Sequence, residues 1–166
     1  MEILNYRQGT HEDIKQLCRL GIASWSHFQS MLEADHWEAL IKNVSSESTY
    51  SVLLDKSFCF VCTENDQMTG MAFLMYSGTA YDVYQADWCS IRFVSVHPGH
   101  TGKGIGRKLT QLCIDKAKEL GERTIALHTS EIMPNARHIY ESFGFTIQKE
   151  ISQRFGQRYW LYTMDI

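Results

Sequence analysis

Apolar residues along this 166-residue chain recur with two periods that alternate from the N-terminus onward. A period of two indicates strands, and a period near 3.6 indicates amphipathic helices. The first half begins with a strand over Glu2 to Arg7 and a helix cap at Thr10 to Asp13 that leads into a helix. A second helical stretch is predicted from Phe28 to Val44, and a shorter turn from Glu47 to Leu54.

The middle of the chain has the pattern of a hairpin followed by a long connection. Two strands, Ser57 to Thr63 and Met68 to Ser77, flank the polar run Glu64 to Gln67, so we expect them to pair antiparallel. The connection Gly78 to Asp87 then leads to a strand from about Trp88 to Val96.

Helical and strand patterns alternate again in the second half. A helix that follows residue 104 should end at Gly121, and another should run from Pro134 to about Phe143 and end at Gly144. Strands are predicted over Thr124 to Thr129, Phe145 to Arg154 and Arg158 to Met164. The helix that ends at Gly121 is expected to bury Ile105, Leu109, Leu112, Cys113, Ala117 and Leu120.

Length and composition narrow the class of protein. The whole chain, 1–166, is expected to form one domain, and its net charge of −3 gives no general attraction for nucleic acid. Apolar runs such as Met71 to Tyr76 are far below the ~20 residues that span a bilayer, so a cytoplasmic protein without a membrane partner is expected. The five cysteines form no disulfide pattern. Strand alternation should send Cys59 and Cys62 to opposite faces, which favours buried thiols over a metal site.

The segment His97 to Lys108, HPGHTGKGIGRK, combines four glycines with three Lys and Arg residues between a strand and a helix. Glycines allow close approach of the backbone, and the N–H groups of a first helical turn suit a phosphate. The spacing matches neither a P-loop nor the GxGxxG fingerprint of dinucleotide-binding folds. It therefore predicts a different pyrophosphate-binding turn.

The loop Thr101 to Gly106 resembles the acetyl-CoA loop of the GNAT acyltransferase superfamily, (Gln/Arg)xxGx(Gly/Ala), and it follows a strand that ends before Pro98. A second block, from Leu127 through Met133–Glu141 to Phe143-Gly144-Phe145, is similar to the next part of that family's pattern. The resemblance is strong over about residues 88–147. It implies a mixed α/β (α+β) fold whose mostly antiparallel sheet has about seven strands, flanked on both faces by about four helices and splayed centrally at a bulge.

The resemblance also implies an activity, the direct transfer of an acetyl group from acetyl-CoA to a primary amine of a small molecule or peptide. Tyr140 occupies the position of the family's general acid, and backbone N–H groups of the strand before the loop would bind the oxyanion. The residues expected at the acetyl-CoA site are Val94, Ser95, Val96, Thr101, Gly102, Lys103, Gly104, Ile105, Gly106, Arg107, Met133, Asn135 and Tyr140.

The general base and the acceptor are less defined. Ser90 stands where family members often have Glu, which leaves Asp87 as the nearest acid upstream, with His97, His128 or a water chain as alternatives. The connection Tyr76 to Asp87 has no Lys or Arg, and its carboxylates and aromatic rings, with aromatic and apolar residues of the N-terminal helices, predict a pocket that attracts a cationic amine. The residues of this prediction are Tyr81, Asp82, Tyr84, Asp87, Trp25, Phe28, Met31 and Trp37. A non-catalytic acyl-CoA sensor is the alternative function. The sequence leaves the oligomeric state open, a homodimer included.

Overall fold

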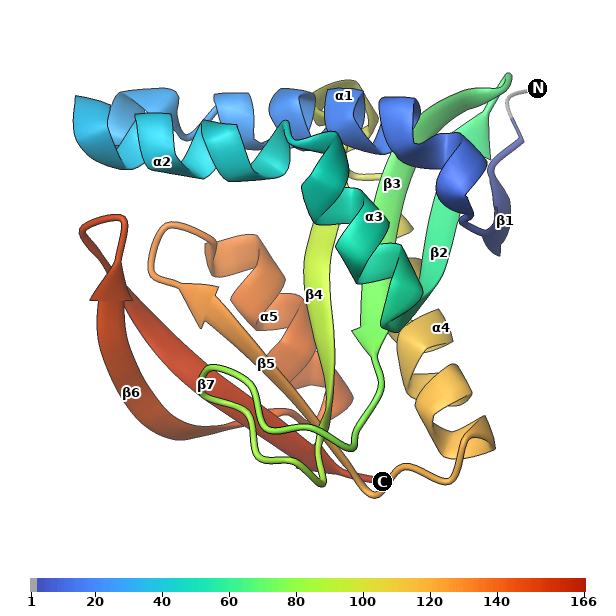
Figure 1. The fold of residues 1–166 in the computed structure, drawn as a ribbon, viewed down its shortest axis with the longest axis vertical. Coiled ribbons are helices and arrows are strands. Elements are labelled where there is room, and N and C mark those ends of the chain that lie inside the picture. Colours follow the sequence, from blue (N-terminus) through green and yellow to red (C-terminus); the bar gives the residue numbers. More distant parts are fainter. Residues whose placement is uncertain (1–2) are drawn as a thin grey trace.

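The computed structural model describes residues 3–166 and contains one seven-stranded sheet in the order β1-β2-β3-β4-β5-β7-β6 (Figure 1). Residue Glu2, where the first strand was expected to begin, lies outside the described residues. The mixed, GNAT-like sheet predicted from the sequence is confirmed. The strands are β1 (Asn5–Gln8), β2 (Ser57–Glu64), β3 (Gln67–Met75), β4 (Cys89–Val96), β5 (Thr124–Ser130), β6 (Thr146–Arg154) and β7 (Gln157–Asp165).

The sheet opens between its two central strands. β4 and β5 run parallel, but only Cys89 and Ser90 of β4 have partners on β5, so the strands diverge beyond that point. On its other edge β4 contains a bulge, because Phe93 and Val94 together lie opposite the single residue Ala72 of β3. Phe93 has φ of 54°, an unusual conformation for a non-glycine residue. The expected splay and bulge are confirmed.

Helices cover both faces of the sheet, as predicted. α1 and α3 pack on one face, and α4 and α5 pack on the other. Residues 3–166 contain five α-helices, whereas about four were expected, because the stretch after Ser46 forms a true helix rather than a turn. The helices are α1 (Ile14–Ser26), α2 (Ala34–Val44), α3 (Glu47–Asp55), α4 (Ile105–Glu119) and α5 (Pro134–Phe143).

Two expectations about the helices were wrong. The stretch from Phe28 to Val44 is divided, because Leu32 and Glu33 are extended between a short 3₁₀ turn and α2. In α4, Leu112 is only half-buried and Leu120 is exposed. Leu120 follows the last helical residue, and Thr110 and Ile114 complete the buried stripe instead.

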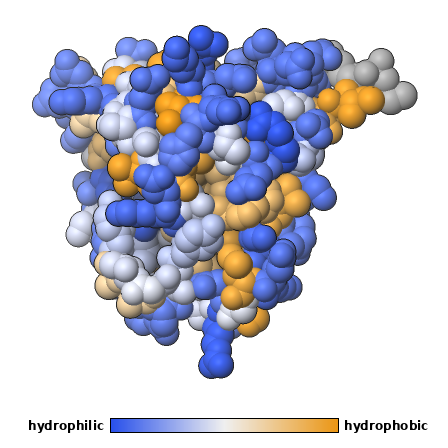
Figure 2. Space-filling model, turned by 45° about the vertical axis from the view of Figure 1, so that its right-hand side comes forward, coloured by the Kyte–Doolittle hydropathy of each residue, from blue (hydrophilic) through white to orange (hydrophobic). Residues whose placement is uncertain are grey.

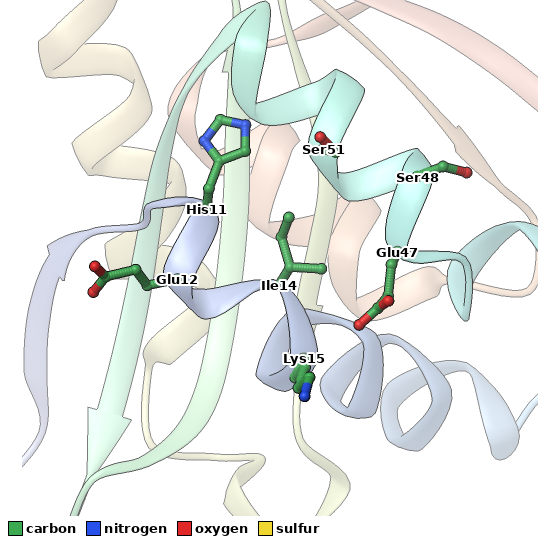
Figure 3. A pocket seen from close by; sticks show the side chains of 7 residues that line it. All are labelled: His11, Glu12, Ile14, Lys15, Glu47, Ser48 and Ser51. Atoms are coloured by element: carbon green, nitrogen blue, oxygen red, sulfur yellow. The ribbon is translucent and has the colours of Figure 1, made fainter.

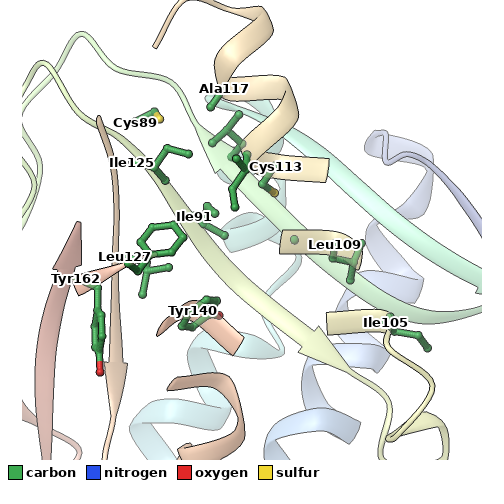
Figure 4. Close-up of a cluster of buried hydrophobic side chains, with 14 of the residues drawn as sticks. Cys89, Ile91, Ile105, Leu109, Cys113, Ala117, Ile125, Leu127, Tyr140 and Tyr162 are labelled. Carbon is green, nitrogen blue, oxygen red and sulfur yellow. The ribbon is translucent and has the colours of Figure 1, made fainter. Parts of the chain in front are cut away.

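The core consists of two main clusters, one on each side of the sheet. Figure 4 shows the cluster beneath α4 and α5, where Leu109 and Cys113 meet Ile91 and Ile125. All five cysteines are buried free thiols. Cys59 belongs to the cluster beneath α1 and α3, and Cys62 to the cluster beneath α4. Strand alternation thus separates the two thiols, as predicted.

The surface is mostly hydrophilic on the side seen in Figure 2, and its broadest hydrophobic area lies right of the centre. β2 contributes half-buried Phe58 and Phe60 on the face it shares with α4, and the Lys116 ammonium lies 4.3 Å from the centre of the Phe58 ring. Among residues 3–166, no helix has both the length and the apolar content that a membrane span requires.

Candidate active site

The glycine-rich loop contains two glycines in the left-handed conformation near its end, and the second of them directly precedes α4. Gly102 has φ of 81° and Gly104, the N-cap of α4, has φ of 76°; a Cβ built on either would meet no atom of residues 3–166 within 4 Å. The first protein-bound amide after the loop is that of Lys108, which donates to the Gly104 carbonyl at 3.0 Å. Within the described chain, the amides of Ile105, Gly106 and Arg107 have no protein acceptor. They form an N–H cluster at the positive end of the helix dipole.

A cavity of about 440 Å³, here called the donor cavity, runs from this loop to α5. It contains most residues expected at the acetyl-CoA site, and it is also lined by His100, which lies in the segment His97 to Lys108 but was not among the predicted site residues. The predicted residues that line it are Val94, Val96, Thr101, Gly102, Gly104, Ile105, Gly106, Arg107, Asn135 and Tyr140.

Three predicted residues lie elsewhere. The Lys103 ammonium is bonded to the buried Glu64 carboxylate at 3.2 Å, and His100 pairs with the other oxygen of Glu64 at the same distance. Lys103 thus fastens the loop to the end of β2. Met133 lines the neighbouring cavity described below. The Ser95 side chain is buried and donates to the Phe93 carbonyl at 3.3 Å.

The backbone of β4 is oriented by its pairing with β3. The His97 amide donates to the Thr69 carbonyl at 2.8 Å, so alternation along the strand directs the amides of Val96 and Val94 to the opposite edge. At that edge β5 has moved away. Both valines line the donor cavity, whereas the Ser95 amide is directed toward β3. Two of the three predicted strand amides are therefore directed toward the gap.

Tyr140 of α5 lies where the donor cavity meets a second cavity, and it lines both. Its side chain is buried, and the Phe145 ring packs against it with 6.0 Å between the ring centres. Burial is the main reason that the pKa of Tyr140 is raised above its ordinary value. The phenol therefore keeps its proton at neutral pH.

The second cavity, here called the acceptor cavity, has a volume of about 500 Å³ and fills the gap between β4 and β5. α1 and α2 contribute Trp25 and Leu40 to its wall. The β6–β7 turn closes another side against α2, because a Cβ at Gly156 would lie 2.8 Å from the His36 ring. Most of the remaining wall is apolar, and Val94, Ala136 and Tyr140 are shared with the donor cavity.

The charged residues of the acceptor cavity are Asp82, Arg92 and Arg154. Arg154 binds Asp82 through two hydrogen bonds of 2.7 and 2.8 Å. Arg92 instead stacks on two aromatic rings, with its guanidinium carbon 4.5 Å from the centre of Tyr81 and 4.6 Å from that of Tyr84. The two arginines come from β4 and β6 and outnumber the single carboxylate. The prediction that acidic side chains dominate this pocket is therefore wrong.

None of the three side chains considered as the general base is well placed. Asp87 is exposed and lines neither cavity. His97 lines neither cavity, and its Nδ1 accepts from the Gly99 amide at 3.0 Å. His128 lines the acceptor cavity, but both ring nitrogens are engaged, Nδ1 with the Tyr84 hydroxyl and Nε2 with Arg154. Burial lowers the pKa of His128 to about 4, so this imidazole is a weak base.

Sequence reasoning expected Trp25 at the acceptor side, and Trp25 lines the acceptor cavity, but it missed Arg92 and Arg154. A signal existed for Arg92, since it is the one charged residue inside the otherwise apolar or hydroxyl-bearing strand Cys89–Val96. Arg154 had none, because it reaches the cavity only through the fold. Within residues 3–166, no group of three His, Cys, Asp or Glu side chains is arranged to hold a metal.

A third hollow lies away from these cavities, between the start of α1 and α3 (Figure 3). His11 and Lys15 lie on one side of it and Glu47 on the other. It shares no lining residue with the donor or acceptor cavity. We assign it no function.

The loop, the splayed sheet and the paired cavities define the class of protein. The chain belongs to the Acetyltransferase (GNAT) family, whose model matches residues 20–145. The L-amino acid N-acyltransferase MnaT of Escherichia coli is 35% identical over 71 residues, which are 41% of this chain and 40% of that protein. The L-methionine sulfoximine/L-methionine sulfone acetyltransferase of Salmonella typhimurium is 32% identical over 108 residues, 61% of this chain and 58% of the relative. Each match spans less than two thirds of the relative.

A solved structure with the same fold is the PaiA N-acetyltransferase of Thermoplasma acidophilum in complex with coenzyme A. It superposes with a TM-score of 0.80, is 15% identical, and the match covers 99% of both chains. The family and fold predicted from the sequence are therefore confirmed.

Proposed function

We propose that this chain is an acetyl-CoA-dependent N-acetyltransferase that moves an acetyl group directly to a primary amine of a small molecule or peptide. The observation that carries the proposal is the position of Tyr140 at the junction of the donor and acceptor cavities. The relatives' names, which describe N-acyl or acetyl transfer, and the coenzyme A in the Thermoplasma structure support it.

The residues of the donor cavity fit coenzyme A. The clustered amides of Ile105, Gly106 and Arg107 suit a pyrophosphate, and the missing Cβ atoms of Gly102 and Gly104 leave room for it against the backbone. Arg107 lines the same cavity and adds a positive charge for the pyrophosphate. One nitrogen of its guanidinium donates to the Ser142 hydroxyl at 3.0 Å. The apolar wall formed by Val96, Ala136 and Ile139 suits the pantetheine arm.

Acetyl-CoA, when bound, supplies a thioester that a neutral amine can attack. The amides of Val94 and Val96 would then donate hydrogen bonds to the carbonyl oxygen as negative charge develops on it. Tyr140 would give its proton to the departing sulfur. One C–N bond forms and one C–S bond breaks. The amine loses one proton and the sulfur gains one, so Tyr140 is restored when the amine's proton returns through solvent.

A non-catalytic acyl-CoA sensor is the second candidate function. It is favoured by one observation, that no described side chain in the acceptor cavity is placed and protonated as a strong general base would be. A sensor would bind acetyl-CoA but release no thiol when amines are added. An enzyme of this design can instead draw the neutral form of the amine from solvent.

The test measures acetyl-CoA binding by calorimetry and thiol release with a panel of amines. We expect acceptor-dependent thiol release, and we expect Tyr140→Phe to lower kcat about 100-fold because the sulfur loses its proton donor. The dissociation constant for coenzyme A should change less than about threefold, since the ring and its packing remain.

Tyr76→Phe is the matched control, because Tyr76 is an exposed residue beyond the end of β3 that lines neither cavity. It should keep the parent kcat. Equal kcat for Tyr140→Phe and the parent protein would remove the acid role of Tyr140. Binding of acetyl-CoA without thiol release from any amine would favour the sensor.

A further inference from the structure

We propose that the acceptor carries a carboxylate beside its amine, and that Arg92 binds this carboxylate in the acceptor cavity. The inference rests on the proposed function and specifies the substrate class for the same site. Three observations support it: the hydrogen-bond partners of Arg92, the balance of charge in the acceptor cavity, and the polar atoms of the cavity wall that lack a partner among the described residues.

Arg92 is held in place without being neutralised. Tyr81 and Tyr84 contact its guanidinium through their ring faces, and its Nε donates to the Ser90 hydroxyl at 3.2 Å. Within the described chain, no residue accepts a hydrogen bond from its two terminal nitrogens, and no carboxylate pairs with it. Stacking fixes the plane of the guanidinium while the terminal N–H groups remain available. A planar fork of this kind matches a carboxylate with two parallel hydrogen bonds.

The other charges of the cavity do not change this preference. The Asp82 carboxylate is bound on both oxygens by Arg154. His128 is neutral, since burial and the two nearby guanidiniums keep its pKa at about 4. Two cations and one carboxylate therefore line the cavity, and the uncompensated charge is that of Arg92. An acceptor with only a cationic amine would meet net repulsion, whereas an anionic group would supply the missing partner.

Two residues of the cavity wall contain a buried polar atom without a partner in the described chain, and one of these atoms can only donate. Among residues 3–166, the indole Nε1 of Trp25 and the hydroxyl of Thr129 are buried and have no hydrogen-bond partner, and both residues line this cavity. An indole N–H can only donate, so its complement is an acceptor atom such as a carboxylate oxygen. A buried donor without a partner is costly in the free protein, and a ligand that satisfies it gains affinity.

The remaining wall defines the rest of the acceptor. Leu40, Val44, Ile91 and Leu127 surround the cavity with apolar side chains. A cavity of about 500 Å³ accommodates a small molecule. The structure therefore assigns an amino acid with an apolar side chain as the kind of acceptor that fits all three features: amine, carboxylate and apolar group.

The experiment compares matched acceptors. Leucine, leucinamide and 3-methylbutylamine share one side chain but differ in the carboxylate, and corresponding sets are made for methionine and phenylalanine. The measured quantity is kcat/KM, corrected for the fraction of neutral amine because the three forms differ in amine pKa. We expect the acid form to exceed both other forms by about tenfold or more, as a charged hydrogen-bonded pair would give.

Variants at Arg92 locate the effect. Arg92→Gln should lower kcat/KM for leucine by about 10- to 100-fold and for 3-methylbutylamine by less than about threefold. Arg92→Lys keeps the charge but loses the fork, so its loss should be intermediate. The control is Arg19→Gln, which removes one positive charge from an exposed residue of α1 outside every cavity described here. It should leave all acceptors unchanged.

A binding measurement separates failure of this inference from failure of the proposed function. Calorimetry with the coenzyme A complex should show that leucine binds more tightly than leucinamide, and that Arg92→Gln removes the difference while coenzyme A affinity is preserved. Turnover of all forms at equal rates would overturn the carboxylate assignment and leave the transferase intact. Absence of turnover with every acceptor would overturn the transferase, and the binding preference would still decide the role of Arg92.

Discussion

His128 shows at the scale of one residue how burial and nearby charge act together. Its side chain is half-buried, and the loss of hydration together with the positive charges of Arg154 and Arg92 opposes protonation more than Asp82 favours it. An arginine can only donate, so the Nε2 of His128 must accept from Arg154, at 3.4 Å, and the ring is neutral. The imidazole thus connects the Asp82–Arg154 pair to Tyr84 as an uncharged link.

This state predicts a pH-dependent stability. The pKa of His128 falls from 6.5 to about 4 on folding, so between these pH values the unfolded chain binds a proton that the folded chain does not. The free energy of unfolding should therefore fall as the pH falls through this window, by up to roughly 3 kcal/mol. His128→Gln cannot be protonated, and its urea unfolding should lack this part of the decrease between about pH 7 and pH 4.

The control for that series is His11→Gln, which changes an exposed histidine whose Nε2 lies 2.9 Å from the Asp55 carboxylate at the surface. It should keep the parent dependence on pH. If the difference in stability between the parent and His128→Gln is the same at every pH, His128 does not titrate as its burial requires.

At the scale of an element, helix α4 has a left-handed glycine at each end. Gly104 caps the N-terminus with φ of 76°, and Gly121 follows the C-terminus with φ of 78°. A Cβ at either position would meet no atom of the described residues within 4 Å, so alanine would introduce backbone strain without a clash among them. Only Gly104 lines the donor cavity. The two glycines therefore form a matched pair for separating stability from binding.

Gly104→Ala and Gly121→Ala should each lower the free energy of unfolding by about 1–2 kcal/mol, the cost of a left-handed alanine. Gly104→Ala should also weaken coenzyme A binding by about tenfold, because its methyl group would occupy space against which the pyrophosphate is expected to lie. Urea unfolding and calorimetry measure the two effects. Equal coenzyme A affinity in both variants would contradict a phosphate site at this loop.

Local signals explain which elements could be predicted from the sequence. The β2–β3 hairpin was predicted from the polar run Glu64 to Gln67, and the structure shows why that composition is informative: Asn65 and Asp66 adopt the left-handed conformation of the turn, with φ of 50° and 62°. The end of α5 was predicted for a similar reason, as Gly144 has φ of 106°. The acceptor cavity lacked such signals. Asp82 and Arg154 are separated by 72 positions in sequence and meet only because β6 lies at the edge beyond β7.

At the scale of the whole molecule, the sheet consists of two antiparallel parts joined by one short parallel contact. β1 to β4 form the first part, and β5, β7 and β6 form the second. Only two residue pairs connect β4 to β5. The donor cavity spans this seam, since β4 and α4 line one side and α5 lines the other. A ligand in the cavity therefore contacts both parts and should stabilise their association.

Coenzyme A is expected to connect the two parts of the sheet when it binds. At about 100 times its dissociation constant, coenzyme A should add about 2.7 kcal/mol of stability and raise the midpoint of thermal unfolding by about 5–10 °C. Hydrogen exchange should slow in residues 94–107 and also in residues 135–140, on opposite sides of the seam. Gly121→Ala should show the same increments from its lower baseline, whereas Gly104→Ala should need about tenfold more coenzyme A to reach them. Protection confined to residues 94–107 would mean that the ligand binds the loop without joining the two parts of the sheet, and that α5, with Tyr140, does not contact it.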